Sequence, residues 1–462
     1  MRSVHGRALL IAALAALLVV PSTASAGERL MTLYSPAFDT APFVHETHQL
    51  VLRPNGKEAP AEPGYVTGIK EQVLVDSKDP DAKPLNNAQF MIHHFLIFAP
   101  ARVDQAPGSC WGASGFIAGR GEEHPDGDFS SFSPPDVRAR YGLTNRTAIG
   151  LAPTWDLTAM VMNHVKRPKT VWVRLKIWYT DEPRDPITPI VVGNCRHLGN
   201  GMAYDVPGGG GRGSEYVDQS DWTVPPGLNG RIIGAASHQH GGAKYHTLES
   251  VTCDREVFRA KTYYGPPDHI YNTIRPILHE PGPIANGTFR SEAGIPITEG
   301  EVFHRRAVHD NANLHVASMG FWVLQVVRDE SVRRCGAMPG DITEIRRPKR
   351  FDETPNYALR VPQLAPPRPT AFRPLKPGRQ LLVEDAGFAR GRVAARVGQP
   401  VTWRFDGVTP HTVTVANGPR GFSSLYTGVA AGTYTFTPRA KGTYRLTCLI
   451  HPTRMGQTLV VK

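Results

Sequence analysis

The chain lacks any long apolar run beyond its first 26 residues. It has 462 residues, of which 40% are hydrophobic and only 8% aromatic. No later stretch approaches the roughly 20 apolar residues that cross a bilayer as a helix. Segments with the 3.6-residue period of an amphipathic helix are also scarce. These absences argue against a stable membrane span and against a mainly helical fold.

The one apolar run stands at the N-terminus. Arg2 and Arg7 precede Ala8–Val20, and Ala24-Ser25-Ala26 supplies the small residues that a signal peptidase needs. No cysteine follows the run, which argues against a lipoprotein anchor. We expect a cleaved signal peptide over residues 1–26 and a secreted or periplasmic protein, with a single membrane anchor as the alternative.

Cysteine is scarce and its count is odd. The five cysteines are Cys110, Cys195, Cys253, Cys335 and Cys448. Outside the cytosol an odd count points to one cysteine with a separate role. The other four could form two disulfides, and the sequence leaves three pairings open.

Positive charge is not concentrated on one segment, although the formal net charge is +11. The densest cluster is Arg346–Arg350, beside a proline-rich stretch. An exported protein rarely meets nucleic acid, so we expect no nucleic-acid partner. A solvated linker, or a docking patch for an acidic partner, explains the cluster better.

Short alternating segments dominate the chain, separated by many of its 45 glycines and 41 prolines. In Val171–Thr180 the apolar residues fall on one face, as in a half-buried strand. Similar runs are Phe90–Phe98, Arg231–Ser237, Phe321–Val327, Thr433–Thr437 and Thr443–Thr447. This pattern predicts an all-β protein made of sandwiches or barrels.

Two polar, proline-containing stretches indicate domain boundaries. Asp181–Thr188 could separate two β domains, and Arg346–Arg379 reads as an extended tether. We therefore expect domains at 27–185 and 186–345, a linker at 346–379 and a compact domain at 380–462.

The last domain contains a candidate type 1 copper site. His411 is expected to open a strand at Thr412–Val415, and Cys448 ends the strand Thr443–Thr447. His451 and Met455 follow in the spacing C-x2-H-x3-M. Type 1 copper needs two imidazoles, one thiolate and a weak axial thioether. The alternative is a buried structural cysteine beside an incidental histidine and methionine.

This segment resembles the cupredoxin family, such as plastocyanin and amicyanin. The resemblance rests on "DGVTPHTVT", "GTYTFT" and "YRLTCLIHPTRM" within residues 381–462. It implies a Greek-key β-sandwich and copper ligands His411, Cys448, His451 and Met455.

Histidine is plentiful, at 18 residues, and several occur in patterns upstream. His93 and His94 lie inside an apolar strand, where adjacent side chains reach one metal only if the strand is bulged or ends. His238 and His240 share one face of a strand and could bind one metal ion. A methionine joining two imidazoles would favour copper over zinc. The alternative for each histidine is an ordinary hydrogen-bonded residue.

The order HH, H, HxH, M resembles the copper type II, ascorbate-dependent monooxygenases. That family includes peptidylglycine α-hydroxylating monooxygenase and dopamine β-monooxygenase, and the resemblance covers roughly residues 30–330. It implies two tandem jelly-roll domains with one copper each. The electron-transfer copper would be held by His93, His94 and His164. The oxygen-activating copper would be held by the catalytic set His238, His240 and Met319.

The chain departs from that family where the peptide-amidating enzyme binds substrate. Ala236 stands in place of an arginine that anchors the substrate carboxylate. Phe321 and Val323 replace an asparagine and a tyrosine, and Met162 replaces a glutamine. The metal frame could therefore be kept while the substrate pocket is not.

Three functional hypotheses follow. The first is an exported copper monooxygenase that hydroxylates a C–H bond of a small-molecule or peptidic substrate, with electrons fed through the cupredoxin from an external donor. The second is a copper-binding, copper-delivery or electron-carrying protein without catalysis. The third, a multicopper oxidase or copper nitrite reductase, fits poorly because the HCH-type motif is missing and only one segment is cupredoxin-like.

Overall fold

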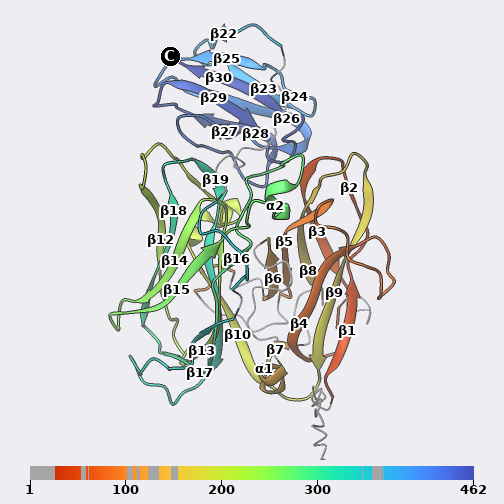
Figure 1. Ribbon diagram of the computed structural model, residues 1–462, viewed down its shortest axis with the longest axis vertical. Coiled ribbons are helices and arrows are strands. Elements are labelled where there is room, and N and C mark those ends of the chain that lie inside the picture. Colours follow the sequence, from red (N-terminus) through yellow and green to blue (C-terminus); the bar gives the residue numbers. More distant parts are fainter. Residues whose placement is uncertain are drawn as a thin grey trace, which may run out of the picture.

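The computed structural model describes residues 27–53, 59–60, 62–100, 108–111, 115–122, 135–146, 154–345, 347–355, 367 and 369–462. The expected signal peptide and the centre of the expected linker lie outside these ranges. Within them, no helix has the length and apolarity needed to cross a bilayer. Figure 1 shows two β-sandwiches side by side with the C-terminal strands packed across one end. The prediction of an all-β protein is confirmed.

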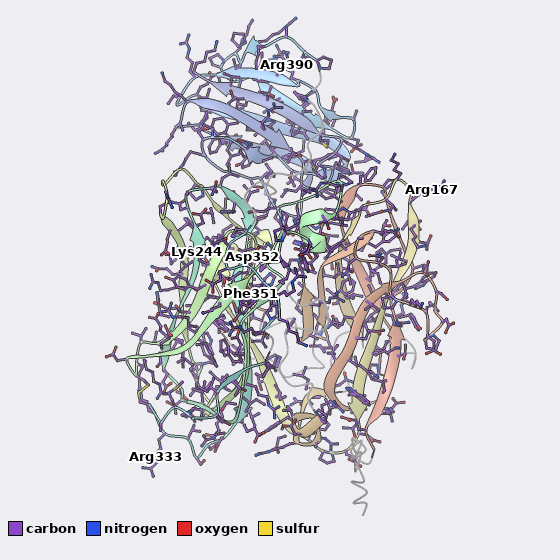
Figure 2. The ribbon with its side chains drawn as sticks, in the orientation of Figure 1. Arg167, Lys244, Arg333, Phe351, Asp352 and Arg390 are labelled. Atoms are coloured by element: carbon purple, nitrogen blue, oxygen red, sulfur yellow. A yellow bond between two sulfur atoms is a disulfide. The ribbon has the colours of Figure 1, made fainter. Side chains whose placement is uncertain are left out.

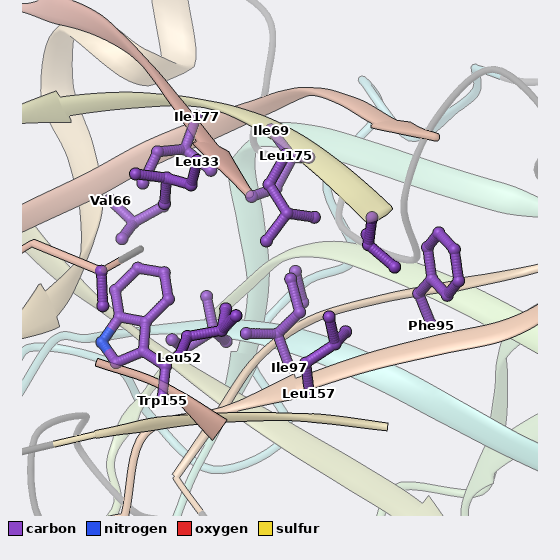
Figure 3. Packing of buried hydrophobic residues seen from close by; sticks show 14 of the residues in the cluster. Leu33, Leu52, Val66, Ile69, Phe95, Ile97, Trp155, Leu157, Leu175 and Ile177 are labelled. Atoms are coloured by element: carbon purple, nitrogen blue, oxygen red, sulfur yellow. The ribbon is translucent and has the colours of Figure 1, made fainter. Parts of the chain in front are cut away.

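The first sandwich is built from two sheets. One contains β1 (Arg29–Tyr34), β2 (Phe38–Thr40), β4 (Gly64–Val75), β7 (Tyr141–Asn145) and β9 (Lys169–Thr180). The other has the order β3 (Val44–Leu52), β8 (Trp155–Asn163), β5 (Phe90–Phe98) and β6 (Phe116–Gly121). A short helix, α1 (Pro135–Arg140), precedes β7. Leu33, Trp155 and Ile177 are fully buried between the sheets (Figure 3).

The second sandwich shares a sheet with the first. Its strands β10 (Asp185–Gly193), β20 (Gly320–Arg328), β13 (Gly230–Gln239), β17 (Thr288–Ile297) and β21 (Thr343–Glu344) continue the first sheet into a ten-stranded one. The two halves join where β10 pairs in parallel with β7. The facing sheet contains β12 (Glu215–Thr223), β18 (Val302–Asp310), β14 (Ala243–Ser250), β15 (Arg255–Tyr263) and β16 (Ala285–Asn286).

Three smaller elements lie at the edges of the second sandwich. They are the 3-10 helix Cys195–Asn200, the helix α2 (Ile270–Thr273) and the pair β11 (Tyr204–Val206) with β19 (His315–Ser318). The expected boundary at 181–188 coincides with the passage from β9 to β10.

The C-terminal sandwich packs two sheets around Trp403, Tyr444 and Cys448. One sheet contains β22 (Arg373–Pro374), β25 (Arg392–Ala395), β30 (Gly456–Val461), β29 (Gly442–Thr447) and β27 (Thr414–Asn417). The other contains β24 (Gly387–Phe388), β23 (Gln380–Glu384), β26 (Val401–His411) and β28 (Val429–Phe436).

The described parts of the expected linker are bound to the sandwiches. Asp352 exchanges backbone hydrogen bonds of 2.8 and 2.9 Å with Tyr264, and the Phe351 ring lies 4.8 Å from that of Tyr263. Figure 2 shows Phe351 and Asp352 against the second sandwich. At the other end, β22 pairs with β25. The tether is therefore anchored at both of its described ends.

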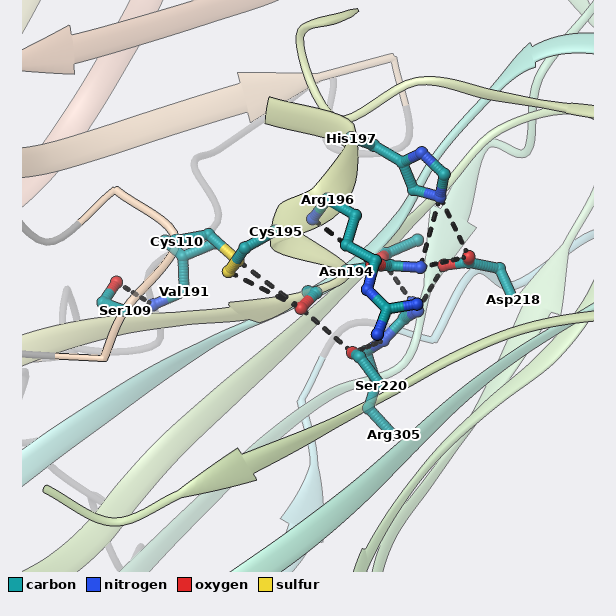
Figure 4. Close-up of a disulfide and its surroundings, with 12 residues drawn as sticks. Ser109, Cys110, Val191, Asn194, Cys195, Arg196, His197, Asp218, Ser220 and Arg305 are labelled. Atoms are coloured by element: carbon teal, nitrogen blue, oxygen red, sulfur yellow. Dashed lines mark hydrogen bonds and ion pairs between the residues drawn. A yellow bond between two sulfur atoms is a disulfide. The ribbon is translucent and has the colours of Figure 1, made fainter. Parts of the chain in front are cut away.

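Four cysteines form two disulfides, which selects one of the three open pairings. Cys110 bonds to Cys195, and Cys253 bonds to Cys335. The first bridge ties a segment of the first sandwich to the start of the 3-10 helix, beside the buried pair Asp218 and Arg305 (Figure 4). Cys448 is free and buried. The cysteine left without a disulfide is thus Cys448, the residue expected from the sequence to bind copper.

Candidate metal centres

The C-terminal ligand set comes from the ends of two strands. His411 is the last residue of β26, and β27 begins only at Thr414, so the expectation that His411 opens a strand at 412–415 is wrong. Cys448 directly follows β29, and the turn to β30 carries His451 and Met455. Met455 is 2% exposed and packs in the core of the sandwich.

The donor atoms of His411, Cys448 and His451 converge. Cys448 Sγ lies 3.9 Å from His411 Nδ1 and 3.7 Å from His451 Nδ1. The backbone N–H of Thr412 donates to the sulfur at 3.3 Å. On the far side of the ring, His411 Nε2 lies 3.1 Å from a carboxylate oxygen of Asp385. A proton on Nε2 leaves the Nδ1 lone pair facing the sulfur, which suits a metal ion.

Burial disfavours the charged forms of Cys448 and His451. Burial raises the pKa of the Cys448 thiol, although hydrogen bonds from Thr412 oppose the shift. Burial also lowers the pKa of His451 to about 4, and nearby His411 adds to the effect. A soft ion that displaces the thiol proton would therefore meet a thiolate beside the neutral imidazole of His451. With His411 these residues offer the two imidazoles and one thiolate of a type 1 copper site.

A β-bulge places both members of the His93–His94 pair in one cavity. The register of β5 against β8 shifts between Ile92 and His94. Adjacent side chains of a regular strand point to opposite faces, whereas an extra residue turns them together. The two ring centroids lie 4.2 Å apart, and both residues line the cavity. The bulge that the sequence reasoning required is present.

His94 meets the HxH pair of the second sandwich. Its Nε2 lies 3.1 Å from His238 Nε2 and 3.3 Å from His240 Nε2. The three ring centroids are 4.9, 4.9 and 5.1 Å apart. Imidazoles that bind one ion at about 2 Å in tetrahedral geometry have centroids about 5 Å apart. The spacing therefore fits one shared ion.

The tautomer of His240 supports the same reading. Its Nδ1 lies 2.8 Å from the carbonyl oxygen of Ala317, which can only accept a hydrogen bond. The proton therefore sits on Nδ1, and Nε2 offers a lone pair toward His94.

His164 and Met319 lie in different surroundings. His164 Nδ1 lies 2.9 Å from the carbonyl oxygen of Pro276, and the ring lines a small pocket with Glu122 and His279. Met319 is 4% exposed and packs in a cluster with Ala317 and Phe321, one residue before β20. His94 lies close to His238 and His240, and donor atoms of His93, His94 and His240 also lie within 4.8 Å of one another. The resemblance had grouped His94 with His93 and His164. The assignment of individual copper ligands stays a prediction.

Three side chains that the sequence reasoning did not single out also reach this region. His45 lies on β3, Glu122 directly follows β6, and His279 lies between α2 and β16. Glu122 Oε1 is 2.6 Å from His93 Nδ1 and contacts His279 Nε2. No local motif marks these residues, because the packing of the two sandwiches brings them together.

Burial dominates the titration of His45, His93, His94 and His164, whereas the carboxylate of Glu122 outweighs burial at His279 and raises its pKa. Burial lowers the pKa of His93 and His94 well below the ordinary range, that of His45 to about 3 and that of His164 to about 4. Neighbouring imidazoles add to the shift at His45, His93 and His94. At neutral pH the four rings are uncharged, so their lone pairs are free of competing protons.

All three sandwiches line the central cavity, whose volume is about 60 Å³. The C-terminal sandwich contributes Tyr426 and Leu449, the latter directly after Cys448. The backbone N–H of His45 donates to the carbonyl oxygen of Ile450 at 3.1 Å. The C-terminal ligand loop is therefore in direct contact with the strand that carries His45.

Comparisons with known proteins find similarity to solved structures over a small part of the chain. No protein-family model and no curated protein matches the chain. A purple cupredoxin from Nitrosopumilus maritimus is 22% identical, over 18% of this chain and 98% of that chain, with a TM-score of 0.16. Auracyanin A, a blue copper protein from Chloroflexus aurantiacus, is 21% identical, over 20% of this chain and 100% of that chain, also with a TM-score of 0.16.

An oxidized amicyanin mutant is 22% identical, over 18% of this chain and 80% of that chain, with a TM-score of 0.16. The chain is thus similar to cupredoxins over about a fifth of its length. The distances among His411, Cys448 and His451 define the site independently of that similarity.

Proposed function

We propose that the chain is a copper-dependent oxidoreductase in which the C-terminal ligand set passes single electrons to copper held by the histidines of the central cavity. One contact carries the proposal, the 3.1 Å hydrogen bond from His45 N–H to the Ile450 carbonyl oxygen. Ile450 stands between Cys448 and His451 in the ligand loop. One backbone hydrogen bond therefore links the C-terminal ligand loop to the strand whose His45 lines the central cavity.

The ring of His45 lies close to the other histidines that line the cavity. The His45 ring centroid lies 4.7 Å from that of His93, which in turn lies 4.2 Å from that of His94. Copper bound at the two centres would supply one-electron exchange at the first and oxygen activation at the second. Both ligand sets belong to one chain and are connected through His45, so no separate docking event is needed.

The finer proposal is hydroxylation of a C–H bond. That reaction consumes O2, two electrons and two protons, and it yields an alcohol and one water molecule. An external donor would supply both electrons through the C-terminal set, one at a time. His238, His240 and Met319 would hold the catalytic copper, which the order of the HH, HxH and M motifs supports.

A non-catalytic copper or electron carrier is the second candidate. The cavity volume of about 60 Å³ favours it. Pockets for drug-sized ligands usually measure about 300–1,000 Å³, so a peptidic substrate would require the cavity to open.

Reoxidation of the C-terminal site by O2 tests the proposal. The copper-loaded chain is reduced without oxygen and mixed with O2, and the return of the blue absorption is followed. We expect fast return in the unsubstituted chain and return at least about 10-fold slower in a His94→Ala, His240→Ala variant. His304→Ala is the control, because His304 pairs with the exposed carboxylate of Asp221. Equal rates in all three proteins would reject electron transfer to the cavity.

A further inference from the structure

A buried carboxylate lies between two imidazoles at the edge of the cavity. Glu122 Oε1 is 2.6 Å from His93 Nδ1 and also contacts His279 Nε2. One donor atom from each residue lies within 4.8 Å of the other two. Glu122 and His93 are each 5% exposed. Three metal-binding atoms from two sandwiches therefore meet at a position where Glu122 and His93 are buried and the His279 side chain is 15% exposed.

The hydrogen bonds of His279 require a cation at this point. Its Nδ1 contacts the carbonyl oxygen of Glu280, which can only accept, so Nδ1 carries a proton. In the neutral ring, Nε2 would then direct a lone pair at the carboxylate of Glu122. Two lone pairs repel, so either a proton or a metal ion must lie between the two atoms.

The hydrogen bonds of His93 are compatible with a metal ion, instead of a proton, beside the carboxylate of Glu122. His93 Nε2 lies 2.8 Å from the hydroxyl oxygen of Tyr426, which can accept a hydrogen bond. In that tautomer the Nδ1 lone pair faces Glu122. The His93 and His279 ring centroids are 4.9 Å apart, close to the spacing of about 5 Å for two imidazoles on one ion.

His164 supplies an independent observation. It is 6% exposed, and its Nε2 has no hydrogen-bond partner among the described residues. Since Nδ1 donates to Pro276, this buried Nε2 carries a lone pair. The ring lines the same small pocket as Glu122 and His279. A buried imidazole lone pair that accepts no hydrogen bond is available to bind a metal ion.

We propose that His93 Nδ1, the Glu122 carboxylate and His279 Nε2 bind a divalent ion, Cu²⁺ or Zn²⁺, with His164 as a further donor. This position uses none of His94, His238 and His240, although the His93 ring centroid lies 4.2 Å from that of His94. Imidazoles with one hard carboxylate suit these ions better than Cu⁺, which prefers sulfur donors. The inference goes beyond the proposed function, because the site would bind a metal whether or not the protein is a catalyst.

Zinc provides a direct structural test. Crystals of the full-length chain are soaked in zinc chloride, and anomalous difference maps are measured on both sides of the zinc absorption edge. We expect a peak between the side chains of Glu122 and His279. A map with a peak at His94 and none at Glu122 would overturn the proposal.

Titration of variants provides a second test in solution. In a metal-free Cys448→Ser background, calorimetry should count two zinc ions per chain. We expect Glu122→Gln and His279→Gln each to weaken one of them by more than about 100-fold, beyond the 10–100-fold typical of a group that only orients a ligand. His304→Gln is the matched control and should retain both ions.

Unchanged zinc binding in both site variants would overturn the proposal. If a variant unfolds, the anomalous maps of the zinc-soaked crystals test the proposal instead. Zinc at Glu122 in a protein that shows no transfer of electrons to the cavity would reject the proposed function and leave this site standing.

Discussion

The hydroxyl oxygen of Tyr426 lies 2.8 Å from Nε2 of His93, although 333 positions separate the two residues in the sequence. Tyr426 belongs to the C-terminal sandwich and His93 to the first. Burial, reinforced by the carboxylate of Glu122, raises the pKa of the Tyr426 phenol, so the group stays neutral at neutral pH. It can therefore fix the tautomer and the orientation of His93 while it closes one wall of the cavity.

Tyr426→Phe should destabilise the protein without removing the C-terminal copper. The change leaves the buried Nε2 of His93 without its partner, at a cost of about 1–3 kcal/mol in the free energy of unfolding. Urea unfolding of both proteins measures it. Tyr434→Phe is the control, since no hydrogen bond to the Tyr434 hydroxyl is recorded among the described residues. Equal stability of the Tyr426 variant and the parent chain would show that the contact contributes nothing.

Met455→Leu should keep copper at the C-terminal site but shift its reduction potential upward. The axial thioether is the weakest donor of a type 1 site, and an apolar group in its place favours the less charged Cu⁺ state. Redox titration of the blue absorption measures the shift. Loss of copper from this variant would mean that Met455 has a structural role that the leucine cannot fill.

Stability should depend on pH through His315. Burial alone would lower the pKa of this imidazole, but the carboxylates of Glu280, at 2.8 Å, and Asp310, at 3.8 Å, raise it to about 9. Because the folded pKa lies above the ordinary value of 6.5, the contribution is complete below pH 6.5 and is lost as pH rises through 9. A rise of this size corresponds to about 3 kcal/mol.

The measurement is the free energy of unfolding of the metal-free protein between pH 6 and pH 10. We expect a decline across that window in the parent chain that is absent from His315→Gln. Parallel pH profiles for the two proteins would contradict the assignment.

Removal of the Cys110–Cys195 bridge should lower stability. The bridge closes a loop with a sequence separation of 85 and connects the first sandwich to the start of the second. Replacing both cysteines with serine frees that loop in the unfolded state, at a cost of about 4 kcal/mol. Thermal unfolding checks the effect. A transition unchanged from that of the parent chain would argue that the bridge does not form in solution.

The C-terminal site can be proposed from the sequence because its signal is local. Cys448, His451 and Met455 lie within eight positions, so one loop holds them close together. Their proximity does not depend on how the sandwiches pack. The all-β class could also be predicted, since the alternation in Val171–Thr180 reflects which face of that strand is buried.

The central cavity could not be predicted in the same way. His94 belongs to the first sandwich and His240 to the second, so their contact depends on how the two bodies pack. The bulge at His93–His94 leaves no signal in residue type. Glu122 stands in a run without any metal-binding spacing, and its role depends on His279, 157 positions away.

Counting copper in the purified mature protein, with visible and electron paramagnetic resonance spectra of the parent chain and Cys448→Ser, tests the central claim most directly. The account predicts about three coppers per chain. Cys448→Ser should lose one of them together with the intense blue band, while type 2 signals from the cavity remain. About one copper per chain, lost entirely in Cys448→Ser, would contradict the account and leave the buried histidines as structural residues.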